Sequence, residues 1–241
     1  MVKEVCHHPR LNEKAPDFEA VTTHGKIKLS DYANKWVVMF SHPADFTPVC
    51  TTEFVAFSKA NEEFKKRNTQ LIGLSIDSVH AHLGWVESIE KNFGVKVPFP
   101  IIADLDMKVA NLYGMVHPAA GSTAAVRSVF IIDDEGILKA LIHYPMSNGR
   151  NIDEVIRLLD ALQTSKKNGV ATPANWKPGD KVIVPPPQTQ DDMYKRKDMG
   201  YEYIDWYLSY NCLLYTSDAA DDLHCIALRG RRHMKKKTQT N

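Results

Sequence analysis

The chain has 241 residues, of which 44% are hydrophobic, and this is enough to bury the core of one ordinary domain plus an appendage. Lysine and arginine (30 residues) balance aspartate and glutamate (29 residues), so the net charge of +1 gives no electrostatic reason to expect nucleic acid or a membrane as the main partner. The sequence shows neither an apolar stretch of about 18 residues that could span a bilayer nor the apolar core of a signal peptide.

The cysteine pattern argues against a structural role for these residues. The four cysteines are Cys6, Cys50, Cys212 and Cys225. They form no Cys-x-x-Cys pair and show no even spacing, so we expect neither a disulfide scaffold nor a zinc site. Cys6 precedes two histidines, but adjacent ligand types without distant partners favour a loose, solvated terminus over a metal site. Reduced thiols, a cytoplasmic location, and the absence of a metal or cofactor are therefore the expectations.

Strands alternate with helices along the first half of the chain. Strands are predicted over residues 26–32, 36–41 and 71–77, and helices from Thr51 to Arg67 and from 79 to 93. The strand at 36–41 is uniformly apolar and should be buried, whereas 26–32 alternates lysines with apolar residues and suits an edge. Ser78 is a suitable N-cap for the second helix, and Gly94 a suitable end.

The second half continues the alternation and then closes with a hairpin. A strand is predicted over 98–103, a short helix over 104–113, paired strands over 128–132 and 137–142, and a helix over 152–162. Asp133-Asp134-Glu135-Gly136 between the paired strands has the composition of a hairpin loop. This order of elements predicts an α/β sandwich with a mixed central sheet.

The composition changes at Ser165, where turn residues and prolines predict an extended arm. The arm carries six large aromatic residues, namely Trp176, Tyr194, Tyr201, Tyr203, Trp206 and Tyr207. These side chains need a surface to cover, either within a domain of their own or on another subunit.

Residues 211–241 end in a basic run from Arg229 to Lys237. The run can be interpreted as a nuclear-localisation or anion-binding patch, but the lack of apolar periodicity favours a disordered or non-native tail. We therefore predict three parts: a main domain over 1–165, a C-terminal arm or domain over 166–210, and the tail over 211–241.

Cys50 is the most informative residue of the chain. It lies where a buried strand and a loop lead into a helix, and the free N–H groups of a first helical turn favour an anion. For cysteine the anion is the nucleophilic thiolate, although a free cysteine can also be merely a small buried hydrophobic residue. The two prolines and the hydroxyl groups around Cys50 favour the reactive interpretation.

Pro43, Thr47 and Cys50 match the P-x-x-x-T-x-x-C signature of the peroxiredoxins, and the stretch from Ser41 to Glu53 resembles the one-cysteine branch of that family. The resemblance extends from about Leu11 to about Tyr210. It implies a thioredoxin-like fold and a thiol-dependent peroxidase that acts on hydrogen peroxide and organic hydroperoxides in antioxidant defence and redox homeostasis. The stretch 176–180 also resembles the C-terminal region that packs against the partner in homodimers of this branch, so we expect a homodimer or a higher oligomer.

The resemblance also implies roles for individual residues. Cys50 would be the nucleophile, Thr47 would place its hydroxyl beside the sulfur, Pro43 would fix the loop and keep the pocket dry, and Arg127 would supply a permanent cation. An arginine suits this role because it stays charged and offers several donors. Without the resemblance, Arg127 would be interpreted as a surface residue at a strand end.

Three further residues are supporting candidates. Glu53 is expected to orient the arginines, with an ordinary first-turn acid as the alternative. Arg150 matches a second arginine of the family pocket. His42 could hydrogen-bond near the sulfur, although a lone histidine at a strand end is as often structural.

Attack on a peroxide would convert Cys50 to a sulfenic acid, which a second thiol must reduce. The resolving cysteine of two-cysteine members, in a V-C-P context, is not found here, so an external thiol, glutathione or a thioredoxin-type protein, is expected as the partner. Some members of the branch also have a G-x-S-x-G lipase motif before the catalytic strand. Residues 32–38 contain neither serine nor glycine, so we do not expect phospholipase activity.

Two other functions compete with the peroxidase. A thioredoxin-like disulfide reductase is disfavoured because that chemistry uses Cys-x-x-Cys. A non-enzymatic holdase could bind unfolded chains through the aromatic arm, and would not turn over peroxide.

Overall fold

The computed structural model describes residues 9–120 and 123–213. The expectations for Cys6, Cys225 and the basic run of the tail lie outside these residues. Contacts divide the chain into two compact units, residues 1–156 and 157–241, each of which is described here by itself. Within the described residues, the helices are all too short or too polar to cross a membrane.

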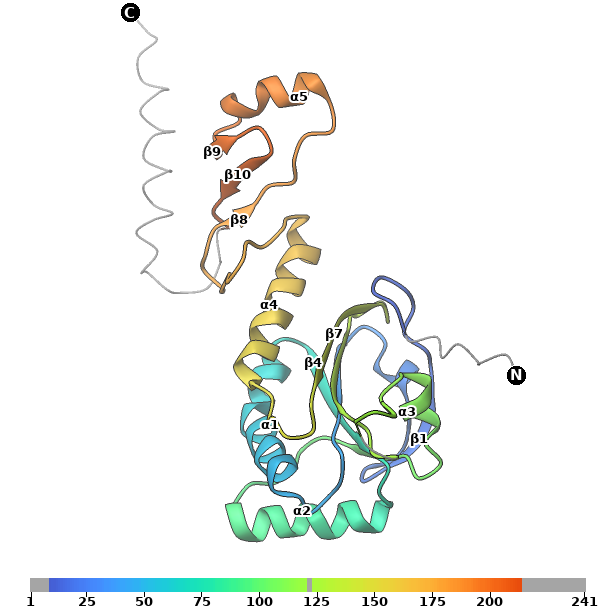
Figure 1. The fold of residues 1–241 in the computed structure, drawn as a ribbon. Helices are drawn as coiled ribbons and strands as arrows, with labels where there is room; N and C mark the ends of the chain where they lie inside the picture. The colour runs from blue at the N-terminus through green and yellow to red at the C-terminus, as the bar shows by residue number, and fades with distance from the viewer. Residues whose placement is uncertain (1–8, 121–122, 214–241) are drawn as a thin grey trace, which may run out of the picture. The chain divides into compact units, whose positions relative to one another are not determined.

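The first unit is built on a seven-stranded mixed sheet (Figure 1). Its strands are β1 (Glu19–Thr22), β2 (Gly25–Lys28), β3 (Trp36–Ser41), β4 (Thr69–Ser75), β5 (Ile101–Ala103), β6 (Arg127–Ile132) and β7 (Leu138–Tyr144), in the order β2-β1-β5-β4-β3-β6-β7. The central pairs β3–β4 and β4–β5 are parallel and the other neighbouring pairs are antiparallel. The predicted α/β class with a mixed sheet is confirmed.

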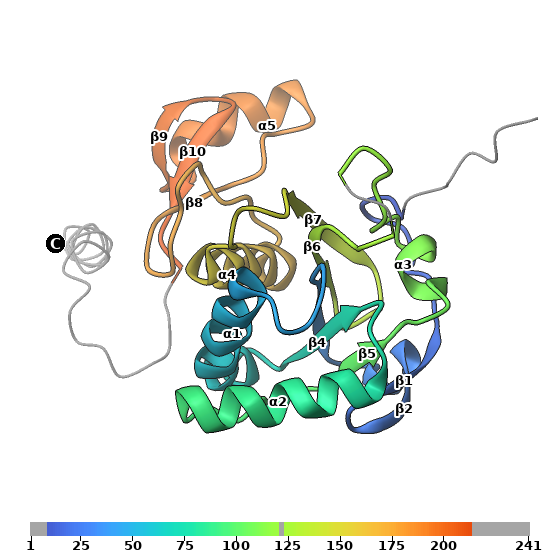
Figure 2. The same ribbon diagram turned by 60° about the horizontal axis from the view of Figure 1, so that its bottom comes forward.

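Helices α1 (Pro48–Lys66) and α3 (Lys108–Leu112) lie on opposite sides of this sheet, and α2 (Val79–Phe93) packs beside α1 (Figure 2). Alternation along β3 explains the two layers, because successive side chains point to opposite faces. Met39 belongs to the cluster that includes Val109 of α3. Phe40, the next residue, stacks on Phe57 of α1 with ring centroids 4.0 Å apart.

Helix α1 begins three residues before the predicted start at Thr51. Pro48 is its first residue, and Thr47 is an extended N-cap. The prediction took Pro48 as a breaker, but proline is well suited to the first helical position because its missing N–H would have no partner there. Cys50 therefore lies inside the first turn of the helix.

The predicted edge strand over 26–32 is only partly correct. Strand β2 ends at Lys28, and Leu29–Tyr32 forms a 3-10 turn (η1). The Asp31 carboxylate accepts a 2.7 Å hydrogen bond from the Lys28 N–H, which offers the backbone an alternative to a strand ladder. Strand β1 was not predicted, because its Glu-Ala-Val-Thr sequence has little alternation.

Two local predictions are confirmed by their capping and turn geometry. Ser78 caps α2 by accepting a 3.1 Å hydrogen bond from Ala81 N, and Gly94 ends the helix in a left-handed conformation at φ 66°. Between β6 and β7, Asp133 Oδ1 accepts hydrogen bonds from the N–H groups of Glu135 and Ile137 and so closes the predicted hairpin loop.

Helix α4 (Ile152–Asn168) runs six residues past its predicted end. Lys166 and Lys167 occupy its last turn, where cations are favoured, and Gly169 follows at φ 62°. The predicted domain boundary at residue 165 thus falls inside a helix, and the division into domains stays a prediction.

The second unit contains the predicted C-terminal arm, which is folded into short strands and a helix and is not extended. It contains β8 (Val182–Ile183), α5 (Gln190–Lys195), the 3-10 turn η2 (Arg196–Asp198), β9 (Glu202–Asp205) and β10 (Leu208–Asn211), with the strands in the order β8-β10-β9. Trp176 is buried against Ala161 and Val182, and its Nε1 donates to the Asp180 carbonyl at 3.1 Å. Of the six aromatics, Trp176 is therefore covered within its own unit, whereas Tyr194, Trp206 and Tyr207 stay exposed.

Candidate active site

Cys50 is the third residue of α1 and is fully buried. The first turn leaves its backbone N–H groups without intrahelical partners, and the aligned peptide dipoles make this end of the helix positive. The sulfur of Cys50 therefore lies at the end of the helix that attracts negative charge.

Arg127 adds a permanent cation to this site from the beginning of β6. Its Nη1 lies 3.3 Å from the Cys50 Sγ and 2.7 Å from Glu53 Oε2, and its Nε donates to the Met146 carbonyl at 2.9 Å. The guanidinium is thus fixed on two sides while one of its nitrogens faces the sulfur. Arginine can do this because its fork of donors is planar and rigid.

Glu53, one helical turn after Cys50, joins the two arginines. Its Oε1 accepts hydrogen bonds from the N and the Nε of Arg150, both at 2.8 Å, and its Oε2 accepts from Arg150 Nη2 at 2.7 Å. Arg150 also donates through Nη1 to the carbonyls of Ser41 and Ser128, both at 2.9 Å. The geometry is that of a bridging carboxylate and not of a first-turn acid facing solvent.

Burial alone would raise the pKa of Glu53, but the hydrogen bonds and charge of Arg150, with the charge of Arg127, outweigh it and hold that pKa below its ordinary value of 4.5. A carboxylate whose pKa is lower in the folded than in the unfolded protein stabilises the fold at pH values above its ordinary pKa. This stabilisation is lost as the pH falls through the pKa of the folded state.

We expect Glu53→Gln to lower the free energy of unfolding at pH 7 by about 3 kcal/mol, because it leaves two buried guanidinium groups without their anion. The difference from the original protein should shrink as the pH falls below 4.5. Urea unfolding at a series of pH values measures both effects, with Glu62→Gln on the exposed face of α1 as a control of near-unchanged stability. Equal stability of the Glu53→Gln and original proteins at neutral pH would contradict this account.

The loop before α1 fixes the side chain of Thr47. Its Oγ1 donates to the Ala44 carbonyl at 2.9 Å, so the hydroxyl proton is held by the loop. Its oxygen lone pairs remain able to accept a hydrogen bond. Pro43 is half-buried in the same loop, which bends at Phe46, a non-glycine residue with φ 54°.

His42 takes part in a buried network that the sequence did not reveal. Its Nε2 lies 2.8 Å from Asp45 Oδ1, and Asp45 Oδ2 lies 2.7 Å from His82 Nδ1 of α2. Among the described residues this is the one group of three acidic, cysteine or histidine side chains whose ligand atoms lie within 4.8 Å of one another. Since both nitrogen–oxygen contacts are hydrogen bonds, the arrangement is accounted for without a metal ion.

The structure brings most of the predicted site residues together. Cys50, Glu53, Arg127 and Arg150 form one connected cluster, and the loop carrying His42, Pro43 and Thr47 leads into it. Asp45 and His82 were missed. A histidine in the apolar stripe of α2, three residues before Trp85, was the available signal for a buried polar contact.

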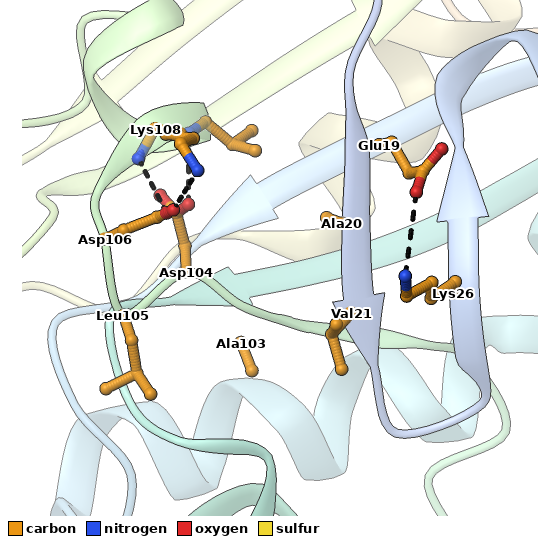
Figure 3. Close-up of a pocket in the computed structure, with 10 residues that line it drawn as sticks. Glu19, Ala20, Val21, Lys26, Ala103, Asp104, Leu105, Asp106 and Lys108 are labelled. Carbon is orange, nitrogen blue, oxygen red and sulfur yellow. Dashed lines mark hydrogen bonds and ion pairs between the residues drawn. The ribbon is translucent and has the colours of Figure 1, made fainter.

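A cavity of about 350 Å³ lies elsewhere, between β1, β2 and the segment that follows β5 (Figure 3). Its charged residues largely pair with one another, Lys26 with Glu19 and Lys108 with Asp106. Since the predicted site residues do not line it, this cavity is separate from the Cys50 cluster.

Comparison with known families assigns both parts of the chain. A model described as the AhpC/TSA family matches residues 11–141, and one described as the C-terminal domain of 1-Cys peroxiredoxin matches residues 161–198. A peroxiredoxin of Aquifex aeolicus is 59% identical over 216 residues, covering 85% of this chain and 97% of that protein. Peroxiredoxin 2 of Caldanaerobacter subterraneus is 59% identical over 211 residues, covering 87% and 95% of the two chains.

Solved structures agree with these relatives. A yeast mitochondrial 1-Cys peroxiredoxin, studied for thiol resolution by the glutathione and thioredoxin systems, superposes with a TM-score of 0.77 at 46% identity, covering 85% of this chain and 99% of its own. A cysteine-to-serine mutant of peroxiredoxin 6 from Arenicola marina gives a TM-score of 0.77 at 40% identity, with 86% and 99% coverage.

Proposed function

Because the chain belongs to the peroxiredoxin family and is a thiol-dependent peroxidase with the thioredoxin-like fold, we propose that its peroxide chemistry takes place on Cys50. The observation that carries this assignment is the position of the Arg127 guanidinium, 3.3 Å from the Cys50 sulfur at the positive end of α1.

The reaction consumes one thiolate and one peroxide. The Cys50 thiolate attacks an oxygen of the hydroperoxide, a sulfur–oxygen bond forms and the oxygen–oxygen bond breaks. The products are the sulfenic acid on Cys50 and, after proton transfer, an alcohol or water. Sulfur is oxidised by two electrons and the peroxide is reduced by two.

Negative charge moves from the sulfur to the leaving oxygen during this step. A fixed donor beside the sulfur therefore stabilises both the reactant thiolate and the transition state. Arg127 is the donor we assign to this task, held in place by Glu53, which Arg150 also holds. The Thr47 hydroxyl donates its hydrogen bond to the Ala44 carbonyl, which leaves the Thr47 oxygen able to accept a hydrogen bond from the peroxide. Pro43 fixes the loop in which Thr47 lies.

We assign the second half of the cycle to an external thiol. Two molecules of a small thiol, or one dithiol protein, reduce the sulfenic acid to the thiol with release of water and formation of a disulfide. The chain lacks the V-C-P context of a resolving cysteine, and its yeast relative was studied with the glutathione and thioredoxin systems. A glutathione or thioredoxin system in the cytoplasm is therefore the reductant we propose.

Peroxide turnover with each reductant tests this function. Purified protein is mixed with hydrogen peroxide or an organic hydroperoxide and with glutathione, or with thioredoxin and its reductase. Continued consumption of peroxide is the expected result. The competing holdase function would give no consumption with any thiol and suppression of aggregation of an unfolded client instead.

We also propose that the chain forms a homodimer through its second unit. Ile204, Trp206 and Tyr207 are 60%, 43% and 54% exposed in the single chain, and such a concentration of exposed apolar side chains marks an interaction surface.

We expect deletion of residues 170–241 to yield monomers and deletion of residues 214–241 to leave the dimer intact. Each buried aromatic contributes roughly 1.5–3 kcal/mol, so the loss of several exceeds what an interface of standard size can lose. Sedimentation at micromolar concentration measures the assembly. A dimer in the shorter protein would contradict this interface, and dissociation of the longer one would assign assembly to residues 214–241.

A further inference from the structure

Three buried side chains form a continuous hydrogen-bonded chain beside the Cys50 cluster. Asp45 uses one carboxylate oxygen for each histidine, Oδ1 for His42 Nε2 at 2.8 Å and Oδ2 for His82 Nδ1 at 2.7 Å. The side chains of His42 and His82 are 0% exposed and that of Asp45 is 2% exposed. The backbone N–H of Asp45 donates to Asp77, which also fixes the loop.

The partners of each nitrogen determine where the protons lie. Burial by itself would raise the pKa of Asp45, but the hydrogen bonds from His42 and His82 outweigh it and lower that pKa, so the group is a carboxylate. A carboxylate can only accept, so His42 Nε2 and His82 Nδ1 both carry protons. His82 Nε2 lies 3.1 Å from the Ile102 carbonyl, so both ring nitrogens of His82 have partners and the ring is fixed in place.

His42 differs from His82 in that only one of its ring nitrogens has a partner within the described residues. Burial lowers its pKa and keeps the ring neutral, and its one proton is on the nitrogen that faces Asp45. Its Nδ1 is buried and has no hydrogen-bond partner within the described residues. A buried acceptor of this kind is costly unless a donor reaches it at some stage of function.

The position of the His42 ring relates this acceptor to the nucleophile. The ring centroid lies 4.7 Å from that of Phe54, one helical turn after Cys50, and 5.0 Å from that of Trp85. Trp85 Nε1 in turn donates to Thr51 Oγ1 at 3.2 Å. His42 is therefore packed on groups that contact the same turn of α1 that carries the sulfur.

From this geometry we infer that Asp45 and His82 are positioning residues, which hold His42 as the neutral Nε2–H tautomer and so present its Nδ1 as a fixed acceptor to the proton-bearing group at Cys50. The inference rests on the proposed role of Cys50. Fixing one tautomer of a histidine through a buried carboxylate is a general means of keeping its other nitrogen ready to accept a proton or a hydrogen bond. His82 serves to keep the carboxylate charged and in place.

Nitrogen-15 NMR of the histidine-labelled protein tests the proton positions without any mutation. At neutral pH we expect the His42 ring to be neutral with its proton on Nε2, and the His82 ring to have a proton on Nδ1, which faces Asp45. Asp45→Leu should redistribute the His42 proton between its two nitrogens. A His42 proton on Nδ1, or a His42 tautomer that Asp45→Leu does not change, would overturn the inference whether or not Cys50 is the redox centre.

A double-mutant cycle tests the effect on the reaction. His82→Leu should slow oxidation of Cys50 by peroxide about tenfold. A general acid or base typically contributes more than this, but the variant keeps His42 and loses only the fixed orientation of its ring. In a His42→Leu background, His82→Leu should cost no further rate, because it acts through His42. His80→Leu, on the exposed side of the same helix, is the matched control and should react as the original protein does.

The alternative outcomes are distinct. An equal loss of rate from His82→Leu in both backgrounds would show that His82 acts through the fold and not through His42. Unchanged rates in both backgrounds would remove His82 from the reaction. Full peroxidase activity in Cys50→Ser would contradict the proposed function instead, and would leave the NMR result as the test of the network.

Discussion

Replacing Cys50 by serine is expected to abolish peroxide reduction. A serine hydroxyl does not ionise near neutral pH, so neither the positive end of α1 nor Arg127 can turn it into a nucleophile for peroxide. Circular dichroism should show an unchanged fold, because serine is close to cysteine in size. Peroxide consumption with excess thiol is the measurement.

The other three cysteines are the internal controls for this prediction. Cys6→Ser, Cys212→Ser and Cys225→Ser should each keep nearly full turnover, because the proposed reductant is an external thiol. A large loss in any of these variants would identify a resolving cysteine within the chain. Residual turnover in Cys50→Ser would show that the chemistry takes place on another residue.

Arg127→Met should slow the reaction of Cys50 with peroxide about a hundredfold. One preorganised donor that faces developing charge is typically worth this much or more, and here the same group also faces the thiolate before reaction. Methionine keeps much of the volume of arginine and removes only the charge and the donors. Stopped-flow measurement of Cys50 oxidation gives the rate, and alkylation by iodoacetamide reports the thiolate separately.

Two variants make the Arg127 result interpretable. Arg10→Met changes an exposed arginine and should react at the original rate. Arg127→Lys keeps a charge but loses the planar fork that reaches Cys50, Glu53 and the Met146 carbonyl together. Its rate should therefore lie between that of Arg127→Met and that of the original protein. An original rate in Arg127→Met would make this arginine structural.

The fold was largely predictable because its signals are local. The apolar run of β3, the cap at Ser78 and the loop at 133–136 each specify their own conformation. The errors arose where a local rule has two outcomes. Pro48 can break a helix or begin one, and the Asp31 side chain turns a strand-like pattern into a 3-10 turn.

The site was predictable to the extent that a motif and a family resemblance carry it. Glu53 lies one helical turn after Cys50, so its proximity to the sulfur follows from the sequence, but its contacts with Arg127 and Arg150 connect residues 74 and 97 positions apart. Spacing alone cannot show such contacts. The Asp45–His82 contact spans 37 positions and belongs to no motif that we recognised.

The packing of the second unit was also beyond what the sequence could predict. Six aromatics in a proline-rich stretch indicate that some surface is covered, but their sequence does not say which. Trp176 finds its partners at Ala161 and Val182, in the same unit, while Trp206 and Tyr207 remain exposed. The distinction depends on β8 pairing with β10, which turn-rich composition did not predict.

The most direct test of the account is the site of the first oxidation. Reduced protein is treated with one equivalent of hydrogen peroxide in the presence of a reagent that traps sulfenic acids, and peptides are then mapped by mass spectrometry. We expect the trapped sulfenic acid on Cys50 alone. Trapping on another cysteine, or consumption of the peroxide with Cys50 still reduced, would contradict the assignment of this residue as the peroxidatic thiol.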